Sequence, residues 1–211
     1  MNIHDIFPLG ELRLRYPRLL TVEQYGKSDV LRVAELAPKV MNGLCLHAWH
    51  RMLKDNEFEH LDPALMEVYI DGPLYQLVAI LDALANPIFY DFSYIACRND
   101  EGILVGQLIV ADVCPNNLHI ADVYFQNPES PLHDSRLNSD GTGYNGFGLL
   151  GKVLDNAECF ARENRNDIVA LVAASDSRVL LFERYGYRLS DDKNGKYARE
   201  MFKRISNLTN A

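Results

Sequence analysis

Three strand-like runs after Pro87 constrain the fold more than any other part of the sequence. They lie within residues 88–128, which read IFYDFSYIACRNDEGILVGQLIVADVCPNNLHIADVYFQNP. The runs are rich in β-branched and aromatic residues, and the turn-forming clusters RNDEG and CPNN separate them. Strands joined by such short turns pair in antiparallel fashion. The sequence therefore predicts a three-stranded antiparallel meander.

The segments on either side add helices and further strands. Residues 18–26 are typical of a first strand, and a helical pattern occupies 28–85. After the meander come a helix, a strand buried on both faces (167–175), a short helix and a C-terminal hairpin. This order predicts an α/β fold with a mixed (α+β) sheet, in a single domain over residues 1–211. Its parts are expected at 18–87, 88–128 and 143–205.

Composition and charge are those of an ordinary globular protein. The chain has 211 residues, 48% of them hydrophobic, which suffices for one sizeable core. No secretory signal and no apolar run of membrane-spanning length is visible, so we expect a cytoplasmic protein that does not bind membranes. The formal net charge of −8, with no basic cluster beyond RLRYPR, argues against a nucleic-acid partner and is compatible with a cationic substrate.

Two features bear on metal binding, and neither predicts a site. The cysteines are far apart with no CxxC pair and are expected to be small reduced core residues: Cys45, Cys97, Cys114 and Cys159. His47 and His50 have the i, i+3 spacing of two ligands on a helix. No third ligand is evident, and HxxH beside Trp49 is more typical of a packing surface. The sequence predicts no metal.

A glycine-rich loop, DGTGYNGFGLLG at 140–151, leads directly into a helical segment and fits two nucleotide-binding patterns on paper. The dinucleotide pattern GxGxxG occurs twice, but the next strand ends in Ser175 where an acidic residue should hold the ribose. The phosphate-loop pattern GxxxxGK[ST] fails because Val153 replaces the hydroxyl that binds magnesium. Neither pattern follows directly on a strand. A nucleotide-binding enzyme is therefore disfavoured.

A third interpretation of the loop needs only its backbone. A glycine loop entering a helix points several N–H groups and the positive end of the helix dipole at one place, which makes an anion site without basic side chains. Glycine lets a pyrophosphate approach the main chain without meeting Cβ atoms. A flexible loop without a ligand is the alternative. The order of the surrounding elements decides between them.

That order resembles the GCN5-related N-acetyltransferase (GNAT) family. The family's acyl-CoA motif is commonly written (Q/R)xxGx(G/A), followed by a helix, a strand and a segment ending approximately YEKxGF. Here the first motif falls on GYNGFG at 143–148 and the second on FERYGY at 182–187. The resemblance covers about residues 88–205. It implies a GNAT-like acyl-CoA N-acyltransferase fold with an enlarged N-terminal helical region.

The resemblance also implies how acetyl-CoA, or another acyl-CoA, would bind as co-substrate. The loop 143–148 would hold the CoA pyrophosphate through its backbone. The strand 117–126 would splay from the strand 167–175, leaving main chain for the pantetheine arm around Val123 to Phe125. The cofactor-binding residues expected on this basis are Val123, Tyr124, Phe125, Gly143, Tyr144, Asn145, Gly146, Phe147, Gly148, Ser175 and Phe182.

The sequence departs from the family pattern at three positions. Gly143 stands where Gln or Arg opens the motif, Ser175 where Asn is frequent, and Phe182 where a Tyr is taken as the acid for the leaving thiolate. Phe182 cannot donate a proton. Tyr185, one turn later, or a water could substitute, or the thiolate could leave without help.

Asp122 is the candidate general base. A carboxylate among apolar neighbours can have a raised pKa suited to accepting a proton. The alternative is that Asp122 caps a bulge or faces water, and His119 and Tyr124 are reserve candidates. The predicted catalytic residues are therefore Asp122 and Tyr185.

Taken together, the sequence predicts transfer of an acyl group, most simply acetyl, from acyl-CoA to a primary amine by direct attack in a ternary complex. The expected acceptor is a small-molecule or peptide amine, and a homodimer is compatible with the long helical region. The alternative keeps the cofactor and drops the reaction: a non-catalytic CoA-binding or interaction module with a GNAT fold. Residues 28–85 and 129–142, which would set the acceptor, do not specify one.

Overall fold

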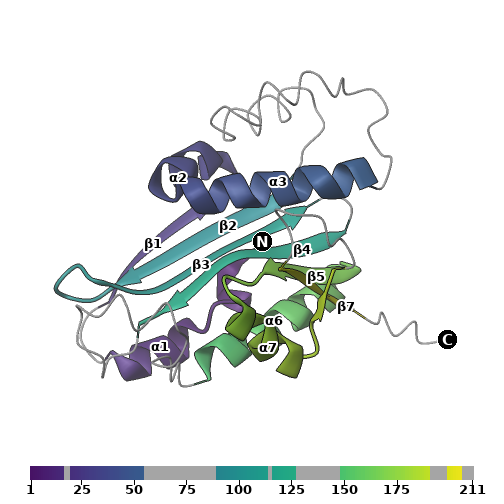
Figure 1. Ribbon diagram of the computed structural model, residues 1–211. Helices are drawn as coiled ribbons and strands as arrows, with labels where there is room; N and C mark the ends of the chain where they lie inside the picture. The colour runs from purple at the N-terminus through teal and green to yellow at the C-terminus, as the bar shows by residue number, and fades with distance from the viewer. Residues whose placement is uncertain (17–19, 55–88, 114–115, 127–147, 191–198, 206–211) are drawn as a thin grey trace.

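The computed structural model describes residues 1–16, 20–54, 89–113, 116–126, 148–190 and 199–205, without the side chains of residues 46 and 49–54. The strands in these ranges form one seven-stranded sheet in the order β1-β2-β3-β4-β5-β7-β6 (Figure 1). Strands β1 to β4 pair in antiparallel fashion, which confirms the predicted meander. The strand bounds are β1 Thr21–Gly26, β2 Phe89–Arg98, β3 Leu104–Val113, β4 Asn117–Phe125, β5 Ile168–Val172, β6 Arg188–Leu189 and β7 Glu200–Arg204.

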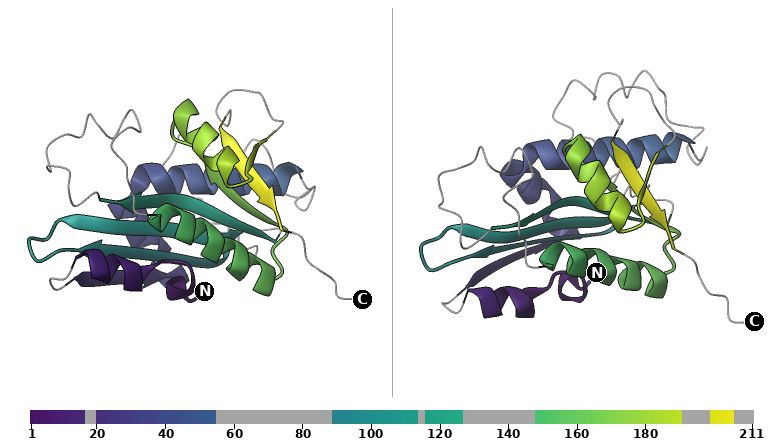
Figure 2. Two further views of the ribbon diagram at one scale, coloured as in Figure 1. Left: turned by 90° about the horizontal axis from the view of Figure 1, so that it is seen from below. Right: turned by 60° about the horizontal axis from the view of Figure 1, so that its bottom comes forward.

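Helices cover both faces of this mixed α/β sheet (Figures 1 and 2). On one face, α2 and α3 pack over β2 and β3 around a core that includes Val33, Leu44 and Phe92. On the other, the N-terminal segment, α6 and α7 enclose a second core. The helix bounds are η1 Ile3–Asp5, α1 Leu9–Arg15, η2 Lys27–Asp29, α2 Val30–Leu36, α3 Pro38–Lys54, α6 Leu149–Glu163 and α7 Asp176–Arg184.

The helix α6 forms because its apolar residues recur at helical spacing. Val153, Leu154, Ala157 and Ala161 are buried against the sheet, and Lys152 and Asp155 are exposed. Leu150 and Phe160 are half-buried and pack against the same core. The amphipathic helix predicted after the glycine loop is therefore confirmed, and it ends at Glu163.

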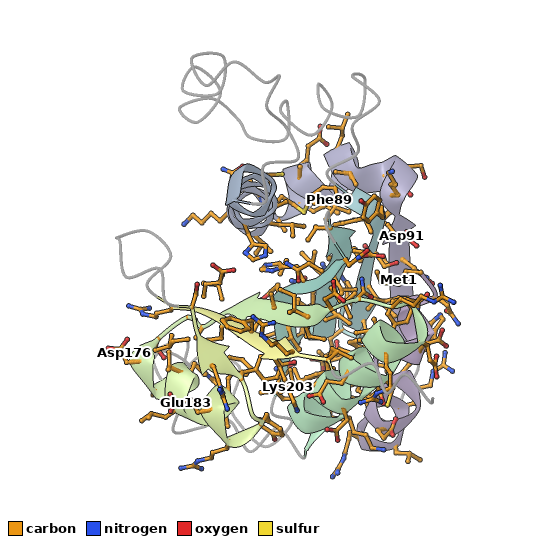
Figure 3. The ribbon with its side chains drawn as sticks, turned by 90° about the vertical axis from the view of Figure 1, so that its right-hand side faces the viewer. Met1, Phe89, Asp91, Asp176, Glu183 and Lys203 are labelled. Atoms are coloured by element: carbon orange, nitrogen blue, oxygen red, sulfur yellow. The ribbon has the colours of Figure 1, made fainter. Side chains whose placement is uncertain are left out.

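The C-terminal strands extend the sheet beyond β5 and are fastened to the helices. Strand β7 pairs in antiparallel fashion with both β5 and β6. From β7, the Lys203 Nζ donates hydrogen bonds to Glu158 Oε1 at 2.6 Å and to the Tyr185 carbonyl oxygen at 2.9 Å. Figure 3 shows Lys203 in the layer between the sheet and α6. One ammonium group thus connects β7 to α6 and to the end of α7.

Two features differ from the sequence-based expectations. The first sixteen residues, for which no structure was expected, contain η1 and α1, and Ile3, Ile6, Phe7 and Leu12 are fully buried core residues. Cys159 is exposed on α6 rather than in the core, because it lies on the helix face opposite Ala157 and Ala161.

The helical region expected over 28–85 is described only as far as Lys54. In the described part of the chain, no helix is long and apolar enough to cross a membrane.

Candidate functional site

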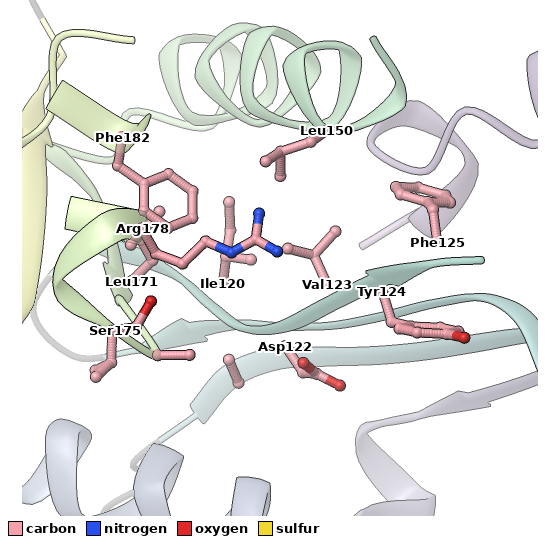
Figure 4. Close-up of a pocket in the computed structure, with 13 residues that line it drawn as sticks. Ile120, Asp122, Val123, Tyr124, Phe125, Leu150, Leu171, Ser175, Arg178 and Phe182 are labelled. Atoms are coloured by element: carbon pink, nitrogen blue, oxygen red, sulfur yellow. The ribbon is translucent and has the colours of Figure 1, made fainter. Parts of the chain in front are cut away.

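A pocket opens where β4 and β5 separate. The two strands pair in parallel only over Asn117–Ile120 and Ile168–Leu171, and β4 then continues to Phe125 without β5. The cavity has a volume of about 460 Å³ (Figure 4). The separation of these strands that the resemblance implies is therefore present. The lining residues are Ile120, Ala121, Asp122, Val123, Tyr124, Phe125, Leu150, Leu171, Val172, Ala174, Ser175, Arg178 and Phe182.

A β-bulge directs β4 into this pocket. Ile109 of β3 lies opposite Asp122, while the next residue, Val110, lies opposite Ile120, so that Ala121 is an extra residue on β4. A bulge bends its strand and increases the local twist. Beyond it, Figure 4 shows Asp122 and Tyr124 on one side of β4 and Val123 on the other. The pocket consequently has side chains of β4 from both faces of the sheet.

The main chain of β4 presents an open strand edge to the pocket. The Gln126 N–H donates to the Val105 carbonyl oxygen on β3 at 3.0 Å. Because backbone direction alternates along a strand, the polar groups of Val123 and Phe125 point the other way, toward the opening. The Val123 N–H is hydrogen-bonded to the Asp122 carboxylate. The Val123 carbonyl and the N–H and C=O of Phe125 thus face the pocket. A ligand with an extended chain of amide groups could form hydrogen bonds with them there.

Asp122 combines access to the pocket with a buried, hydrogen-bonded setting. Its Oδ2 accepts a hydrogen bond from Gln107 Nε2 at 2.6 Å, and Gln107 Oε1 accepts a longer one from the Tyr94 hydroxyl at 3.4 Å. Burial raises the pKa of the carboxyl, and the bonds from Gln107 and the Val123 N–H partly oppose that effect. The alternative expected from the sequence was that Asp122 caps a bulge or faces water. It holds in part, because Asp122 follows the bulge at Ala121 and bonds the Val123 N–H of its own strand. It nevertheless lines the pocket, as a general base must.

The reserve candidates are placed differently from Asp122. Tyr124 lines the pocket, but burial raises the pKa of its phenol, so this hydroxyl is a hydrogen-bond donor rather than a base. His119 is buried outside the pocket lining, with its ring stacked on His47 at a centroid distance of 3.8 Å. His47 in turn lies 3.1 Å from Glu200 Oε1 through its Nδ1. His47 is thus part of a buried packing cluster, and the side chain of His50 lies outside the described residues.

The N-terminus of α6 borders the pocket through Leu150. The helix begins after Gly148, whose φ of +74° is a conformation that favours glycine. The N–H groups of residues 149–151 have no acceptor within the helix and point out of its positive end. Gly148 is the one described residue of the predicted pyrophosphate loop. The other members, Gly143, Tyr144, Asn145, Gly146 and Phe147, lie outside the described residues.

The N-cap residue of α7 and two residues of the helix face the pocket at helical spacing. Ser175 precedes the first turn, with its Oγ 2.9 Å from that of Ser177, and Phe182 is buried at the other end. Both were expected to contact the cofactor. Arg178, between them, was not identified from the sequence. Its spacing from Ser175 and Phe182, at i+3 and i−4, is the signal that would have revealed it.

Tyr185 does not line the pocket, although it was predicted as a proton donor. Its ring packs on α6, where a Cβ atom added to Gly151 would lie 3.0 Å from the Tyr185 hydroxyl oxygen. The side chain thus fills the contact between α6 and the end of α7. A catalytic role for Tyr185 stays a prediction, without support from its position.

Comparison with known proteins gives a consistent but remote likeness. No protein-family model matches the sequence, and no curated protein sequence matches it significantly. Solved structures do match. An acetyltransferase of the GNAT family from Staphylococcus aureus Mu50 is 14% identical, with 89% of this chain and 99% of that one covered at a TM-score of 0.41. A PaiA N-acetyltransferase from Thermoplasma acidophilum in complex with coenzyme A is 12% identical, with 88% and 99% covered at a TM-score of 0.39.

A GNAT family N-acetyltransferase from Escherichia coli in complex with CoA is 15% identical, with 63% of this chain and 67% of that one covered at a TM-score of 0.36. Many of the matching structures are GNAT-family N-acetyltransferases. These superpositions are loose, with TM-scores of 0.41, 0.39 and 0.36.

Proposed function

We propose that this protein is an acyl-CoA-dependent N-acyltransferase of the GNAT type, most simply an acetyltransferase that acts on a primary amine. The observation that carries the proposal is the opening between β4 and β5, where an unpaired strand edge and apolar side chains line one pocket. An arm made of amides and methylene groups needs both of these surfaces. The N-terminus of α6 at the same pocket suits the phosphates.

Residues of β4, α6 and α7 would each bind a different part of the co-substrate. The Phe125 N–H and C=O and the Val123 carbonyl would bond the amide groups of the pantetheine arm, while Leu150 and Phe182 would pack on its methylene groups. The first-turn N–H groups of α6 would bind the pyrophosphate together with the glycine loop. Bound acyl-CoA supplies an activated thioester carbonyl at the point where the strands part.

Asp122 would receive the amine on the opposite side of β4. Gln107 bonds Asp122 and also accepts a hydrogen bond from Tyr94, which belongs to the core beneath α2 and α3, whereas Val123 packs on the core beneath α1, α6 and α7. The pocket therefore reaches both faces of the sheet at the place where β4 and β5 separate. We infer that the amine enters from the face covered by α2 and α3 and the co-substrate from the other. Both can then be bound at once, as a ternary complex requires.

The reaction consists of one bond formed and one bond broken. The amine arrives as an ammonium ion, attracted by the Asp122 carboxylate, and gives a proton to it or to a water that it holds. The amine nitrogen then bonds the carbonyl carbon, the C–S bond breaks, and the sulfur leaves with the electron pair. The nitrogen still carries one surplus proton, which passes to the Asp122 carboxylate after that group has released the first proton to solvent. The Tyr124 hydroxyl, protonated because of its raised pKa, can donate a hydrogen bond at the same pocket.

A continuous thiol-release assay with acetyl-CoA and a panel of amines tests this proposal. The panel should include polyamines, amino acids, peptide N-termini and aromatic amines, with product masses measured to find the added acetyl group. We expect amine-dependent thiol release with at least one class. If acetyl-CoA binds but no amine gives turnover above hydrolysis, the protein is a binding module; if acetyl-CoA does not bind either, the proposal is wrong.

A further inference from the structure

A basic side chain enters a pocket whose other lining residues are mostly apolar. Arg178 of α7 shares one face of its helix with Ser175 and Phe182, and all three line the cavity. Figure 4 shows the guanidinium extending across the pocket from α7 toward Val123. Ile120 and Leu171, the last paired residues of β4 and β5, line the same cavity. The positive charge is therefore directed at the region where the two strands part.

Neither of the two positions on or after α7 that were considered for a proton donor supplies one to the leaving sulfur. Phe182 has no ionisable group, and the Tyr185 hydroxyl is packed against Gly151 on α6. A departing thiolate can be stabilised in a second way, by a fixed positive charge. A guanidinium stays protonated throughout the physiological pH range, and its interaction with an anion is stronger in a partly desolvated site than in water.

We propose that Arg178 is a catalytic residue that stabilises the negative charge on the leaving sulfur, in place of a proton donor at position 182. The proposal rests on the acyltransferase function described above. As the C–N bond forms and the C–S bond breaks, the electron pair stays on sulfur and the amine proton passes to Asp122. Arg178 donates an N–H hydrogen bond to the sulfur and transfers no proton. The thiolate leaves as such and is protonated in solvent.

The direct readout is the pKa of the thiol of bound CoA, which does not depend on turnover. Thiolate absorbance is followed across a pH series with CoA bound to the wild-type protein, to Arg178→Gln and to Arg178→Lys. The absorbance of protein alone is subtracted because Cys159 is exposed. We expect the wild-type protein to lower the pKa of the bound thiol by about 1 to 3 pH units relative to free CoA. Arg178→Gln should lose this shift and Arg178→Lys should keep part of it.

Arg184→Gln is the matched control, because Arg184 is an exposed residue of the same helix, outside the pocket lining, and the change in charge is the same. It should leave the pKa of the bound thiol unchanged. In turnover, Arg178→Gln should lower kcat about 10- to 100-fold with little change in the KM for acetyl-CoA. Adding Phe182→Tyr to Arg178→Gln should restore part of kcat by supplying a proton donor. Circular dichroism of each variant confirms that it is folded.

Two results would overturn the role of Arg178 while leaving the proposed function intact. One is active wild-type protein in which the bound thiol has the pKa of free CoA. The other is an Arg178→Gln variant with unchanged kcat and weakened CoA binding, which would place the guanidinium on a CoA phosphate. If wild-type protein binds no CoA, the proposed function itself fails, and this inference fails with it.

Discussion

At the scale of single residues, the setting of Asp122 decides when it can accept a proton. Burial favours its neutral form and raises its pKa, and the hydrogen bond from Gln107 favours the charged form and opposes that rise. A general base works only when deprotonated, so activity should increase with pH as Asp122 loses its proton. The raised pKa moves this increase to a higher pH than an ordinary aspartate would give.

The roles of Asp122 and Gln107 can be tested through the pH dependence of kcat/KM. Asp122→Asn should lower activity about 100- to 10,000-fold and remove the acidic limb of the profile. Gln107→Leu removes the bond that stabilises the carboxylate, so the pKa rises further and the acidic limb should move up by about 1 pH unit. Gln24→Leu, on the exposed side of β1, is the control and should leave the profile unchanged. A limb that stays in place, or moves to lower pH, in Gln107→Leu would show that Asp122 is not the base.

The candidate site could be predicted from sequence only where its residues belong to one local motif. Ser175 and Phe182 were found in this way, and Asp122 was found through its apolar neighbours. Gln107 could not be found, because it meets Asp122 only through the β3–β4 register and the bulge at Ala121. Tyr185 was expected to act in place of Phe182, yet it lies beyond the last residue of α7 as its C-cap, and its ring packs against Gly151 of α6.

At the scale of elements, the pocket depends on how α6 and α7 stand over the separated strands. Periodicity predicted α6, β5 and α7 and the three strands of the meander, because each has a continuous pattern and clear turn residues at its ends. The N-terminal η1 and α1 were missed because they are short and because Pro8 and Gly10 resemble loop residues. Their burial comes from tertiary packing, with Phe7 stacked on Phe125 of β4 at 5.4 Å.

The contact between α6 and α7 can be tested with a matched pair of glycine substitutions. Gly151→Leu places a side chain where the Tyr185 hydroxyl lies, so it should push α7 from α6 and destabilise the fold by about 1–3 kcal/mol. Acetyl-CoA binding should weaken because Ser175, Arg178 and Phe182 move with α7. Gly43→Leu is the control, since Gly43 is exposed on α3 with nothing within 4 Å of an added Cβ.

Urea unfolding and acetyl-CoA titration of both glycine variants provide the measurement. We expect a lower unfolding midpoint and a higher Kd for Gly151→Leu, and neither change for Gly43→Leu. Equal stability and equal affinity in the two variants would show that the Gly151–Tyr185 contact does not position α7.

At the scale of the whole molecule, the sheet is covered on both faces, and the pairing of β4 with β5 stops beside the pocket. The mixed sheet and its order of elements could be predicted from the sequence, since they follow from chain order and local pattern. The proposed approach of the amine could not be predicted, because it depends on which face of the sheet α2 and α3 occupy. These helices lie on the face toward which Gln107 and Tyr94 hold Asp122.

The central claim, that the opening between β4 and β5 binds acyl-CoA, is tested most directly by isothermal titration of the protein with acetyl-CoA. Wild-type protein should bind one molecule per chain, with a Kd in roughly the micromolar range. Ala174→Trp, which places a bulky ring at the pocket wall, should abolish binding. Leu180→Trp, at an exposed position of α7 outside the pocket, should not affect it. No binding by wild-type protein, or equal binding by Ala174→Trp, would contradict the claim.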